Sequence, residues 1–495
     1  MSAAPFFADA TAILRELAAR GVQPRGLASD SRRVRPGDLF MAFPGAAADG
    51  REHIPEAIRR GAAAVLWQNG DGFAWQGEWR LPNLSAARPR SLCGPLAQAV
   101  FGHPSERLSL IAVTGTNGKT SVGQWLARLH PRSCATIGTL GAGFPGQPAE
   151  PGLTTPEAAA LARHLAEFAA AGAQACALEA SSIGIEEKRL DGTRIDVAVF
   201  TNLTRDHLDY HGTMDNYAAA KERLFRWPRL RLAVINVDDP FGRELTRRTS
   251  ASRVLGYTRD GNFADRQGIV RADAVEETPG GLRFVLDTPT GRARVETRLL
   301  GRFNVANLLA VAAVLIDAGL TPAEVAERFA DLSPPPGRLE AIGGPGEPLV
   351  VIDYAHTPDA LENALASLRG TAAARGGRLI AVFGCGGGRD RGKRPLMGEI
   401  ARRLADRAVL TSDNPRDEEP ADILAEIGAA APDAEVIEER AAAIRRTILS
   451  CEKNDVLLLA GKGHEAYQEI AGARRPFSDA GEARDALAAW REERR

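Results

Sequence analysis

A glycine-rich turn between an apolar run and a helix-forming segment carries the strongest chemical signal in the sequence. The apolar stretch LSLIAV leads into this turn, and the helix-forming stretch TSVGQWLARL follows it. Glycines let backbone N–H groups point at phosphate oxygens, and a helix N-terminus adds positive potential. A lysine here can reach the β- and γ-phosphates of a nucleotide, and a threonine hydroxyl can ligate Mg²⁺. The predicted nucleotide-binding residues are Gly115, Thr116, Asn117, Gly118, Lys119, Thr120 and Ser121.

This turn departs from the full Walker pattern. That pattern would need glycine at position 113, where the chain has Val113. The loop is therefore a shortened variant. A glycine-rich turn without a ligand is the alternative interpretation, but the strand before it and the helix after it favour phosphate binding.

A carboxylate closes the next apolar run. Glu179 stands in ACALEASS, at the C-terminal end of an expected buried strand. Open α/β sheets bind ligands at this end of their strands, and Mg²⁺ beside substrate phosphates usually takes one or two carboxylate ligands. Glu179 is therefore a predicted magnesium ligand, with a strand-end glutamate on the surface as the alternative.

Histidines and carboxylates gather after the strand expected at DVAVFTN. His207 and His211 occur with Asp206 and Asp209 in TRDHLDYHG, which would place oxygen and nitrogen ligands beside the phosphate edge of the sheet. The four-residue gap between the histidines also resembles a zinc pair. However, HLDYH lacks the glutamate of HExxH, and Gly212 indicates a loop, so zinc is the less favoured interpretation.

Lysine is rare in this chain. Only six of the 62 basic residues are lysines, so a lysine hints at a place where a compact or deprotonable amine is needed. Lys221 follows the histidine motif on an expected helix, in AAKERLF. A salt bridge on a solvated helix face is the alternative for this residue.

Short apolar runs that alternate with helical stretches must position these residues. LSLIAV, ACALEA, DVAVFTNL and RLAVINV are typical of parallel strands covered on both faces. Residues 268–300 alternate in polarity instead, as in an antiparallel flap. Further along, LVVIDYA, RLIAVFG, RAVLTSD, AEVIEE and DVLLLAG predict a second open α/β sheet.

The 495 residues suffice for three domains of about 150 residues each. Pro104 and the prolines at 334–336 mark the expected boundaries, because proline interrupts helices and central strands. We therefore expect an α/β fold with a small mixed N-terminal domain over residues 1–104. A central domain over 105–334 would contain a P-loop, a doubly wound parallel sheet and the antiparallel flap, and residues 335–495 would form a C-terminal open α/β sheet.

Composition excludes several classes of protein. A net charge of -1 argues against nucleic-acid binding, and 44% hydrophobic residues argue against disorder. The five cysteines lack CxxC spacing, so neither a disulfide framework nor a zinc ribbon is expected. The sequence shows neither a signal h-region nor an apolar run of about 18 residues, which predicts a soluble cytoplasmic protein without membrane insertion.

The motifs together resemble those of the Mur ligase family. They are SDSRRV, TGTNGKT, LEASS, TNLTRDHLDYHG with AAKERLF, LLGRFNVANLLAVAAV, PPPGRLE, DYAHTPDAL, FGCGGGRDRGKRPLM, DNPR and GKGHE. The resemblance extends from residue 29 to residue 465 and therefore covers nearly the whole chain. It implies that the three domains bind, in chain order, the UDP moiety, ATP and the incoming amino acid.

The resemblance implies an ATP-dependent amide ligase that adds meso-diaminopimelate to UDP-N-acetylmuramoyl-L-alanyl-D-glutamate in peptidoglycan precursor synthesis. The substrate carboxylate would attack the γ-phosphate of ATP, and the amine would then attack the resulting acyl phosphate. Lys119, Glu179, His207 and Lys221 would be the catalytic residues. Mg²⁺ would be bound by Thr120, Glu179, His207 and Lys221, the last as a carbamate (N6-carboxylysine), which requires a neutral amine that arginine cannot supply.

Further site residues follow from the same motifs. ATP would also contact Asn304, Asn307, Arg338 and Asp353. The UDP-muramoyl peptide would contact Ser31, Arg32, Ala46, Ala47, Ala48, Thr154, Thr155, Ser181, Glu187 and Arg189. The chain departs from the family pattern at Ile183, where relatives commonly have histidine, and at Glu187, where they have glutamine. Glu187 is therefore included without a defined role.

The amino-acid pocket would use the DNPR and GKGHE motifs. Its predicted residues are Arg389, Asp413, Asn414, Pro415, Arg416, Gly461 and Glu465. Diaminopimelate carries a second carboxylate that lysine lacks, and a guanidinium such as that of Arg416 can bind it bidentately. With lysine bound, Arg416 would stay unpaired, which costs affinity.

Three alternatives stay open at this point. A lysine-adding ligase would keep the nucleotide site, and Arg416 is the residue that discriminates against it. A folylpolyglutamate-type ligase would share the central domain but would not explain SDSRRV. An inactive ATP-binding module is disfavoured by the intact Lys119, Glu179, His207 and Lys221. We expect a monomer that acts on small-molecule substrates.

Overall fold

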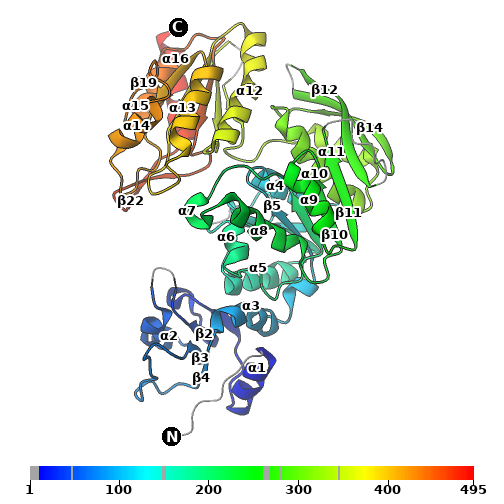
Figure 1. Cartoon of the computed structure of the whole chain (residues 1–495), viewed down its shortest axis with the longest axis vertical. Coiled ribbons are helices and arrows are strands. Elements are labelled where there is room, and N and C mark those ends of the chain that lie inside the picture. The colour runs from blue at the N-terminus through cyan, green and yellow to red at the C-terminus, as the bar shows by residue number, and fades with distance from the viewer. Residues whose placement is uncertain are drawn as a thin grey trace.

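The computed structural model describes residues 10–45, 48–147, 152–259, 268–278, 281–343 and 346–494. Three lobes follow one another along the chain, each built around its own main sheet (Figure 1). The N-terminal and C-terminal lobes lie at opposite ends of the molecule, with the central lobe between them. The expected α/β fold with three sheets is therefore confirmed.

A four-stranded parallel sheet in the order β1-β2-β3-β4 forms the N-terminal lobe. Its strands are β1 (Gly26–Ala28), β2 (Asp38–Ala42), β3 (Ala64–Gln68) and β4 (Asn83–Ala86). Its helices are α1 (Ala10–Ala19), α2 (Ile54–Arg59) and α3 (Pro89–Val100), with 3-10 turns η1 (Ser31–Arg33), η2 (Gly50–His53) and η3 (Pro104–Glu106). Leu39 and Leu66 of this sheet share a buried cluster with Ala162 of the central lobe, so these two lobes pack directly together.

The central sheet has ten strands in the order β14-β13-β12-β11-β10-β9-β5-β8-β6-β7. The strands are β5 (Ser109–Thr114), β6 (Cys134–Gly138), β7 (Gly141–Gly143), β8 (Ala175–Glu179), β9 (Val197–Phe200), β10 (Leu232–Asn236), β11 (Arg253–Thr258), β12 (Ile269–Thr278), β13 (Gly281–Thr288) and β14 (Gly291–Thr297). The pairs from β12 to β6 are parallel. β12, β13 and β14 pair antiparallel, which confirms the flap, and a further short antiparallel strand, β7, lies at the other edge.

Helices cover both faces of the central sheet. They are α4 (Lys119–Leu129), α5 (Ala158–Ala170), α6 (Ser182–Glu186), α7 (Leu208–His211), α8 (Met214–Phe225), α9 (Pro240–Arg248), α10 (Phe303–Asp317) and α11 (Pro322–Ala330). Successive residues of β5 enter different cores: Ile111 and Val113 belong to one buried cluster, and Leu110 and Ala112 to another. This burial on both faces explains why the parallel strands are continuous apolar runs in the sequence.

The C-terminal lobe contains a six-stranded sheet in the order β15-β16-β20-β17-β18-β19 and the hairpin β21-β22. The strands are β15 (Glu340–Ile342), β16 (Leu349–Asp353), β17 (Leu379–Phe383), β18 (Arg407–Leu410), β19 (Glu435–Val436), β20 (Val456–Ala460), β21 (Tyr467–Ile470) and β22 (Ala473–Pro476). The helices are α12 (Pro358–Arg375), α13 (Lys393–Leu404), α14 (Pro420–Gly428), α15 (Arg440–Leu449) and α16 (Asp479–Glu493). Only β15 runs antiparallel to its neighbour within the six-stranded sheet.

The five cysteines form no disulfide bond, as their spacing in the sequence predicts. Cys93, Cys134, Cys176, Cys385 and Cys451 all carry free thiols and are buried. Burial raises the pKa of the Cys385 thiol to about 12, so this thiol stays protonated at neutral pH. Within the described ranges, every helix is too short or too polar to cross a lipid bilayer.

Candidate active site

Three adjacent parallel strands bring the predicted site to one edge of the central sheet. The order β9-β5-β8 places the carboxyl ends of these strands side by side. β5 leads into the glycine-rich turn, Glu179 is the last residue of β8, and β9 leads into residues 201–211. Motifs far apart in the sequence therefore meet where open α/β sheets bind their ligands.

Glycines shape the turn after β5. Gly115 has φ 152° and Gly118 has φ 87°, conformations that residues with a Cβ rarely adopt. A Cβ on Gly115 would overlap Thr201 Oγ1, and a Cβ on Gly118 would overlap Asn307 Oδ1. The Thr201 hydroxyl also donates to the Asn117 carbonyl oxygen at 2.6 Å. The turn is thus held between the segment after β9 and helix α10.

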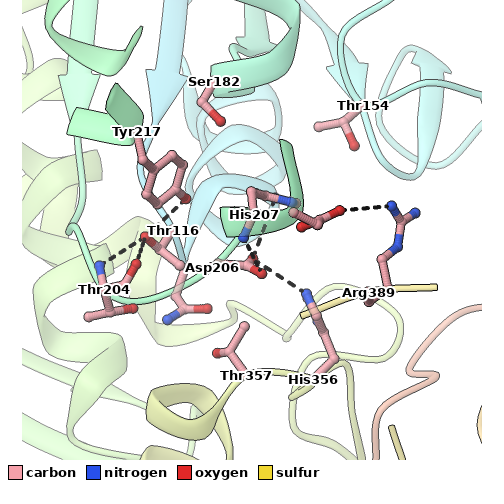
Figure 2. Close-up of polar contacts among 12 residues, drawn as sticks. Thr116, Thr154, Ser182, Thr204, Asp206, His207, Tyr217, His356, Thr357 and Arg389 are labelled. Carbon is pink, nitrogen blue, oxygen red and sulfur yellow. Dashed lines mark hydrogen bonds and ion pairs between the residues drawn. The ribbon is translucent and has the colours of Figure 1, made fainter. Parts of the chain in front are cut away.

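The side chains of Thr116 and Asn117, both predicted to bind the nucleotide, form hydrogen bonds with other residues of the chain. Thr116 Oγ1 donates to the Thr204 carbonyl oxygen at 3.1 Å and lies 3.2 Å from the Tyr217 hydroxyl (Figure 2). Asn117 Nδ2 donates to Asp359 Oδ2 of the C-terminal lobe at 2.7 Å. The first N–H groups of a helix lack intrahelical acceptors. The backbone at the start of α4 therefore supplies the groups that can bind phosphate.

Lys119 lies over the turn. Its Nζ donates to the carbonyl oxygens of Gly115 at 2.8 Å and Thr116 at 2.9 Å. Burial lowers the pKa of Lys119, while the carboxylates of Glu179 and Asp206 favour its charged form. The ammonium group is therefore positioned inside the turn, where it can neutralise a bound phosphate.

The Glu179 carboxylate is 2% exposed and accepts three hydrogen bonds. Oε1 accepts from Thr139 N at 3.0 Å, and Oε2 accepts from Thr139 Oγ1 and Thr120 Oγ1, each at 3.1 Å. A Cβ on Gly138 would overlap Oε1, so the carboxylate occupies a cradle that requires glycine. The Thr120 hydroxyl accepts a further hydrogen bond from Arg338 Nη2 at 3.1 Å.

This donor set fits magnesium better than zinc. The described residues contain no cluster of three or more His, Cys, Asp or Glu side chains that could hold a metal by itself. A structural zinc site requires four protein ligands and a catalytic one requires three. Mg²⁺ instead binds one or two carboxylates together with substrate phosphates and water, which matches Glu179 and Thr120 at the end of a phosphate-binding turn.

Asp206 joins the central lobe to the C-terminal lobe. Its Oδ2 lies 3.4 Å from His207 Nε2 and 3.7 Å from His356 Nε2 (Figure 2). Burial favours the neutral carboxyl, but His356, His207 and Lys393 outweigh it and hold the pKa of Asp206 well below its usual range. Burial lowers the pKa of His207 to about 4, so its ring is neutral at pH 7 and can act as a metal ligand.

The second histidine of the motif has a different partner. His211 Nε2 lies 3.0 Å from Ser182 Oγ, and the His211 ring packs 5.2 Å from the Tyr217 ring. His207 faces Asp206 instead. The two rings therefore have different polar partners, although both pack against the Tyr217 ring.

Lys221 is 1% exposed on α8. Its Nζ donates to the Gly115 carbonyl oxygen at 2.9 Å and lies 4.3 Å from the centre of the Tyr217 ring. Burial holds the pKa of Lys221 well below its ordinary value, and the nearby Lys119 lowers it further. Because the side chain is buried against a backbone carbonyl, the alternative of a salt bridge on a solvated face is wrong.

A pocket between the central and C-terminal lobes contains most of the residues predicted for diaminopimelate. Central-lobe residues Asp206, His207 and Asp209 form part of its wall. From the predicted amino-acid set, the wall includes Arg389, Asp413, Asn414, Arg416, Gly461 and Glu465. The pocket therefore connects the phosphate edge of the central sheet with the DNPR and GKGHE motifs. Pro415 is outside this lining.

Both pocket arginines are paired with carboxylates of the chain. Arg389 Nη1 lies 3.5 Å from Asp209 Oδ2 across the lobe boundary, and Figure 2 shows this guanidinium beside the His207 segment. Arg416 has φ 51°, its Nη1 donates to the Gly387 carbonyl oxygen at 2.6 Å, and its Nε lies 3.8 Å from Glu469 Oε2. These contacts keep the two guanidinium groups beside the pocket. A carboxylate of a ligand could take the place of Asp209 or Glu469 as their partner.

Two pocket lysines were missed by the sequence analysis. Lys393 lines the pocket, and its Nζ donates to the His356 carbonyl oxygen at 2.8 Å. Lys462 is fully buried behind the wall, with its Nζ 3.0 Å from Asn414 Oδ1 and 2.9 Å from Glu465 Oε2. The rarity of lysine in this chain was the signal that could have identified both.

The residues predicted for the muramoyl peptide gather beside Glu179. Thr155 Oγ1 donates to the Glu179 carbonyl oxygen at 2.8 Å and accepts from Ser181 N at 2.9 Å. Thr154 Oγ1 lies 3.1 Å from Thr139 Oγ1. Arg189 Nη1 donates to the Thr155 carbonyl oxygen at 2.8 Å. Glu187 pairs with this guanidinium, with Oε2 2.5 Å from Nη2 and 3.0 Å from Nε.

The other residues predicted to contact ATP come from helix α10 and the C-terminal lobe. Asn307 Nδ2 donates to Asn304 Oδ1 at 3.0 Å on α10. Asp353 Oδ2 accepts from Leu339 N at 2.7 Å, and burial raises the pKa of this carboxyl. The Arg338 guanidinium stacks 4.6 Å from the centre of the Tyr354 ring.

Of the residues predicted for the UDP moiety, Ser31, Arg32 and Ala48 lie in the N-terminal lobe, outside the pocket. Ser31 Oγ donates to Glu56 Oε2 at 2.7 Å, and the exposed Arg32 binds Asp30 through Nη2 at 2.9 Å. Ala48 is within the described chain, and Ala46 and Ala47 lie outside the described residues.

Comparison with known protein families assigns all three lobes. Residues 24–101 match the model described as "Mur ligase family, catalytic domain", residues 113–315 the "Mur ligase middle domain" and residues 337–463 the "Mur ligase, glutamate ligase domain". The matched segments together cover well over half of the chain. The chain belongs to the Mur ligase family, a class of ATP-dependent ligases, which confirms the predicted resemblance.

Relatives with similar sequences cover nearly the whole chain. The UDP-N-acetylmuramoyl-L-alanyl-D-glutamate--2,6-diaminopimelate ligase of Chromobacterium violaceum is 49% identical over 97% of this chain and 97% of its own. The enzyme of the same name from Ectopseudomonas mendocina is 48% identical over 95% and 96%. A solved structure of a protein with this name is 37% identical, covers 94% of this chain and 95% of its own, and superposes with a TM-score of 0.66.

Proposed function

We propose that this Mur ligase uses ATP to join diaminopimelate to the D-glutamyl carboxylate of UDP-N-acetylmuramoyl-L-alanyl-D-glutamate. The observation that carries the proposal is the pocket shared by two lobes, which connects Asp206 and His207 at the phosphate edge with Arg389 and Arg416. A reaction that first activates an acid with ATP and then couples it to an amino acid needs such a connection. The identity to two relatives that carry this name supports the choice of substrates.

Activation of the acid brings two anions together. The substrate carboxylate attacks the γ-phosphate of ATP, which forms an acyl phosphate and releases ADP. The backbone at the start of α4 and the ammonium group of Lys119, held over the turn, would neutralise the phosphates. Arg338, which reaches Thr120 from the C-terminal lobe, adds positive charge when the two lobes close on the nucleotide. The protein's contribution is therefore positioning and charge neutralisation.

Magnesium is part of this proposal. Thr120, Glu179 and His207 would hold it, and Lys221 would join them as a carbamate. When bound, Mg²⁺ screens the repulsion between the carboxylate and the phosphates. The hydrogen bonds from Thr139 and Thr120 hold the Glu179 carboxylate at the turn, where it could ligate the cation.

The coupling step takes place in the shared pocket. The amine of diaminopimelate attacks the acyl-phosphate carbonyl carbon, phosphate leaves, and the amine nitrogen gives up a proton. Arg389 and Arg416 would bind the carboxylates of diaminopimelate, while Asp413 and Glu465 would bind an ammonium group. Orientation of the amine by these groups converts a bimolecular step into an effectively unimolecular one.

The test is phosphate release from ATP with every substrate varied in turn. We expect release to require both the UDP-muramoyl dipeptide and an amino acid, and to favour meso-diaminopimelate over L-lysine. The reason is that lysine lacks the second carboxylate and cannot form its charge-assisted hydrogen bond to a pocket guanidinium, a bond that contributes about 1.5–3 kcal/mol. Equal kcat/KM values for the two amino acids would reject the specificity assignment, and release without the dipeptide would reject the reaction.

Carbamylation of Lys221 has a separate test. The lowered pKa of Lys221 favours the neutral form of its amine, which is the form that reacts with CO₂. Lys221→Ala is expected to lose activity and to recover part of it with short carboxylic acids that replace the carbamate. Lys188→Ala, at an exposed lysine of the same lobe, is the control. Full activity of untreated Lys221→Ala would exclude this role.

A further inference from the structure

A buried ammonium group lies behind the amino-acid pocket. Lys462 follows β20 and its side chain has no exposed surface. Its Nζ donates to Asn414 Oδ1 at 3.0 Å and Glu465 Oε2 at 2.9 Å, and lies 3.7 Å from Asp413 Oδ1. All three of these partners line the pocket, whereas Lys462 itself does not.

The four side chains form a charge cluster with a net negative charge. Two carboxylates, Asp413 and Glu465, face one ammonium group, so the cluster carries a charge of about −1 when all three are ionised. Two carboxylates that share a site without a cation repel each other and cannot both stay ionised easily. The Lys462 ammonium lies between these two acidic side chains and offsets part of their repulsion, and the cluster still offers more acidic than basic groups to a ligand. A single ammonium group of an amino acid matches that charge.

Lys462 also fixes the orientation of Asn414. An ammonium group has donors only, so the oxygen of the Asn414 amide must face it. Glu469 N donates to the same oxygen at 2.9 Å, and the amide nitrogen consequently donates to Glu465 Oε2 at 2.8 Å. These hydrogen bonds fix the positions of the oxygen and the nitrogen of the Asn414 amide. Glu465 is held between Lys462 and Asn414.

We propose that Lys462 is a positioning residue that sets the charge and orientation of the Asp413, Asn414 and Glu465 side chains, which receive an ammonium group of the incoming amino acid. This inference rests on the proposed function of the pocket. The chain uses arginine for almost all of its positive charge, but a planar guanidinium could not meet three partners arranged around one point. The compact lysine ammonium can.

The test compares Lys462→Met with the control Lys453→Met, which changes an exposed lysine of the same lobe. For Lys462→Met we expect the KM for diaminopimelate to rise at least about tenfold, since hydrogen bonds to a charged group are lost. The KM values for ATP and for the UDP-muramoyl dipeptide should stay within about twofold, because the contacts of Lys462 are confined to the amino-acid pocket. Lys453→Met should behave as the unchanged protein.

The split between KM and kcat separates positioning from a general loss of structure. Lys462→Met removes the donor that Asp413, Asn414 and Glu465 share, so the KM for diaminopimelate should rise while kcat at saturating diaminopimelate stays within about threefold. An unchanged KM for diaminopimelate, or an equal rise in all three KM values, would overturn the proposal.

Two further results keep the outcome decisive. If Lys462→Met does not fold, Lys462→Arg keeps the buried charge and is expected to raise the KM for diaminopimelate severalfold with the other KM values unchanged; no rise would overturn the inference. If the unchanged enzyme shows no dependence on diaminopimelate, the proposed function fails before any variant is compared.

Discussion

At the residue scale, the rarity of lysine marks the site. Of the six lysines, Lys188 and Lys453 are exposed, whereas the other four lie at the nucleotide turn or the pocket. These four are Lys119, Lys221, Lys393 and Lys462, and each Nζ donates to a carbonyl or carboxylate oxygen. Burial of an ammonium group is costly unless such partners are present, so these positions are defined by their surroundings.

Glu187 is an internal competitor for a substrate carboxylate. Its Oε2 lies 2.5 Å from Arg189 Nη2, on the guanidinium predicted to contact the muramoyl peptide. Glu187→Gln removes the carboxylate at Arg189 Nη2 and leaves Glu157 Oε1 3.4 Å from Nε, so we expect the KM for the UDP-muramoyl dipeptide to fall about three- to tenfold with kcat nearly unchanged. Steady-state kinetics with saturating ATP and diaminopimelate provide the measurement.

The matched control for this prediction is Glu186→Gln. Glu186 pairs with Arg223 at 2.9 Å on the neighbouring helix face, away from Arg189. Its substitution should leave the KM for the dipeptide unchanged. A higher KM in Glu187→Gln would mean that Glu187 instead holds Arg189 in its productive orientation.

His464 makes stability depend on pH. Burial lowers the pKa of His464 to about 4, with a further contribution from Arg338. The unfolded chain has a pKa near 6.5, so between pH 6.5 and 4 the unfolded state binds a proton that the folded state does not. Stability therefore falls as the pH falls through this window. We expect His464 to account for a loss of about 2 kcal/mol of unfolding free energy between pH 7 and pH 5.

Denaturant unfolding at the two pH values measures this effect. His464→Gln should show a smaller difference between pH 7 and pH 5 than the unchanged protein. Substitution of the exposed His53 by glutamine should leave the difference as it is. An identical pH dependence in all three proteins would contradict the assignment to His464.

At the scale of elements, β5 and α4 explain the shortened phosphate turn. Val113 replaces the first glycine of the Walker pattern because β5 continues through Thr114, and the Val113 side chain is fully buried in the sheet. The turn begins only at Gly115. Gly115 and Gly118 are therefore the residues that must adopt the positive φ angles of the turn.

Gly118→Ala tests that requirement. Its φ of 87° and the overlap of a Cβ with Asn307 Oδ1 require the turn to move. We expect a destabilisation of about 1–3 kcal/mol and at least a tenfold rise in the KM for ATP. Thermal unfolding and nucleotide titration measure the two effects.

Gly123→Ala is the control within the same helix. There a Cβ would meet only Glu179 Cγ at 3.8 Å, and alanine should stabilise the helix by about 0.8–1 kcal/mol. If Gly118→Ala and Gly123→Ala changed the KM for ATP equally, the geometry of the turn would not be the cause of the change in ATP binding.

At the scale of the whole molecule, ion pairs and hydrogen bonds join the central and C-terminal lobes. Arg205 Nε donates to Asp390 Oδ2 at 2.9 Å, and Asp209 pairs with Arg389 at 3.5 Å. Asp206 also faces His356 across the same boundary (Figure 2). The contacts hold the amino-acid pocket against the nucleotide edge, so we expect their loss to weaken substrate binding.

Arg205→Ala should weaken this closure. A partly exposed pair contributes about 0.2–1 kcal/mol, so we expect the KM values for ATP and diaminopimelate to rise together by about two- to fivefold. The KM of the unchanged enzyme should rise with salt, and that of the variant should rise less. Kinetics at several ionic strengths provide the test.

Asp390→Asn should reproduce the effect of Arg205→Ala, and the double variant should add nothing further. Arg248→Ala removes exposed ion pairs within the central lobe and is the control. Additive effects of Arg205→Ala and Asp390→Asn would argue against a single coupled pair.

The strand-turn-helix motif, the parallel strands and the family could be predicted from the sequence because each depends on local order. The motif LLGRFNVANLLAVAAV contains most of helix α10 (Phe303–Asp317), whose apolar residues are nearly continuous. β6, β7, β11 and the hairpin β21-β22 were not predicted, because they are short or carry polar residues. The Lys462 cluster, the Glu187–Arg189 pair and the Arg205–Asp390 pair depended on the tertiary structure. Spacing in the sequence reports which backbone conformations are available, but the partner of a buried charge is set only when distant strands and lobes pack together.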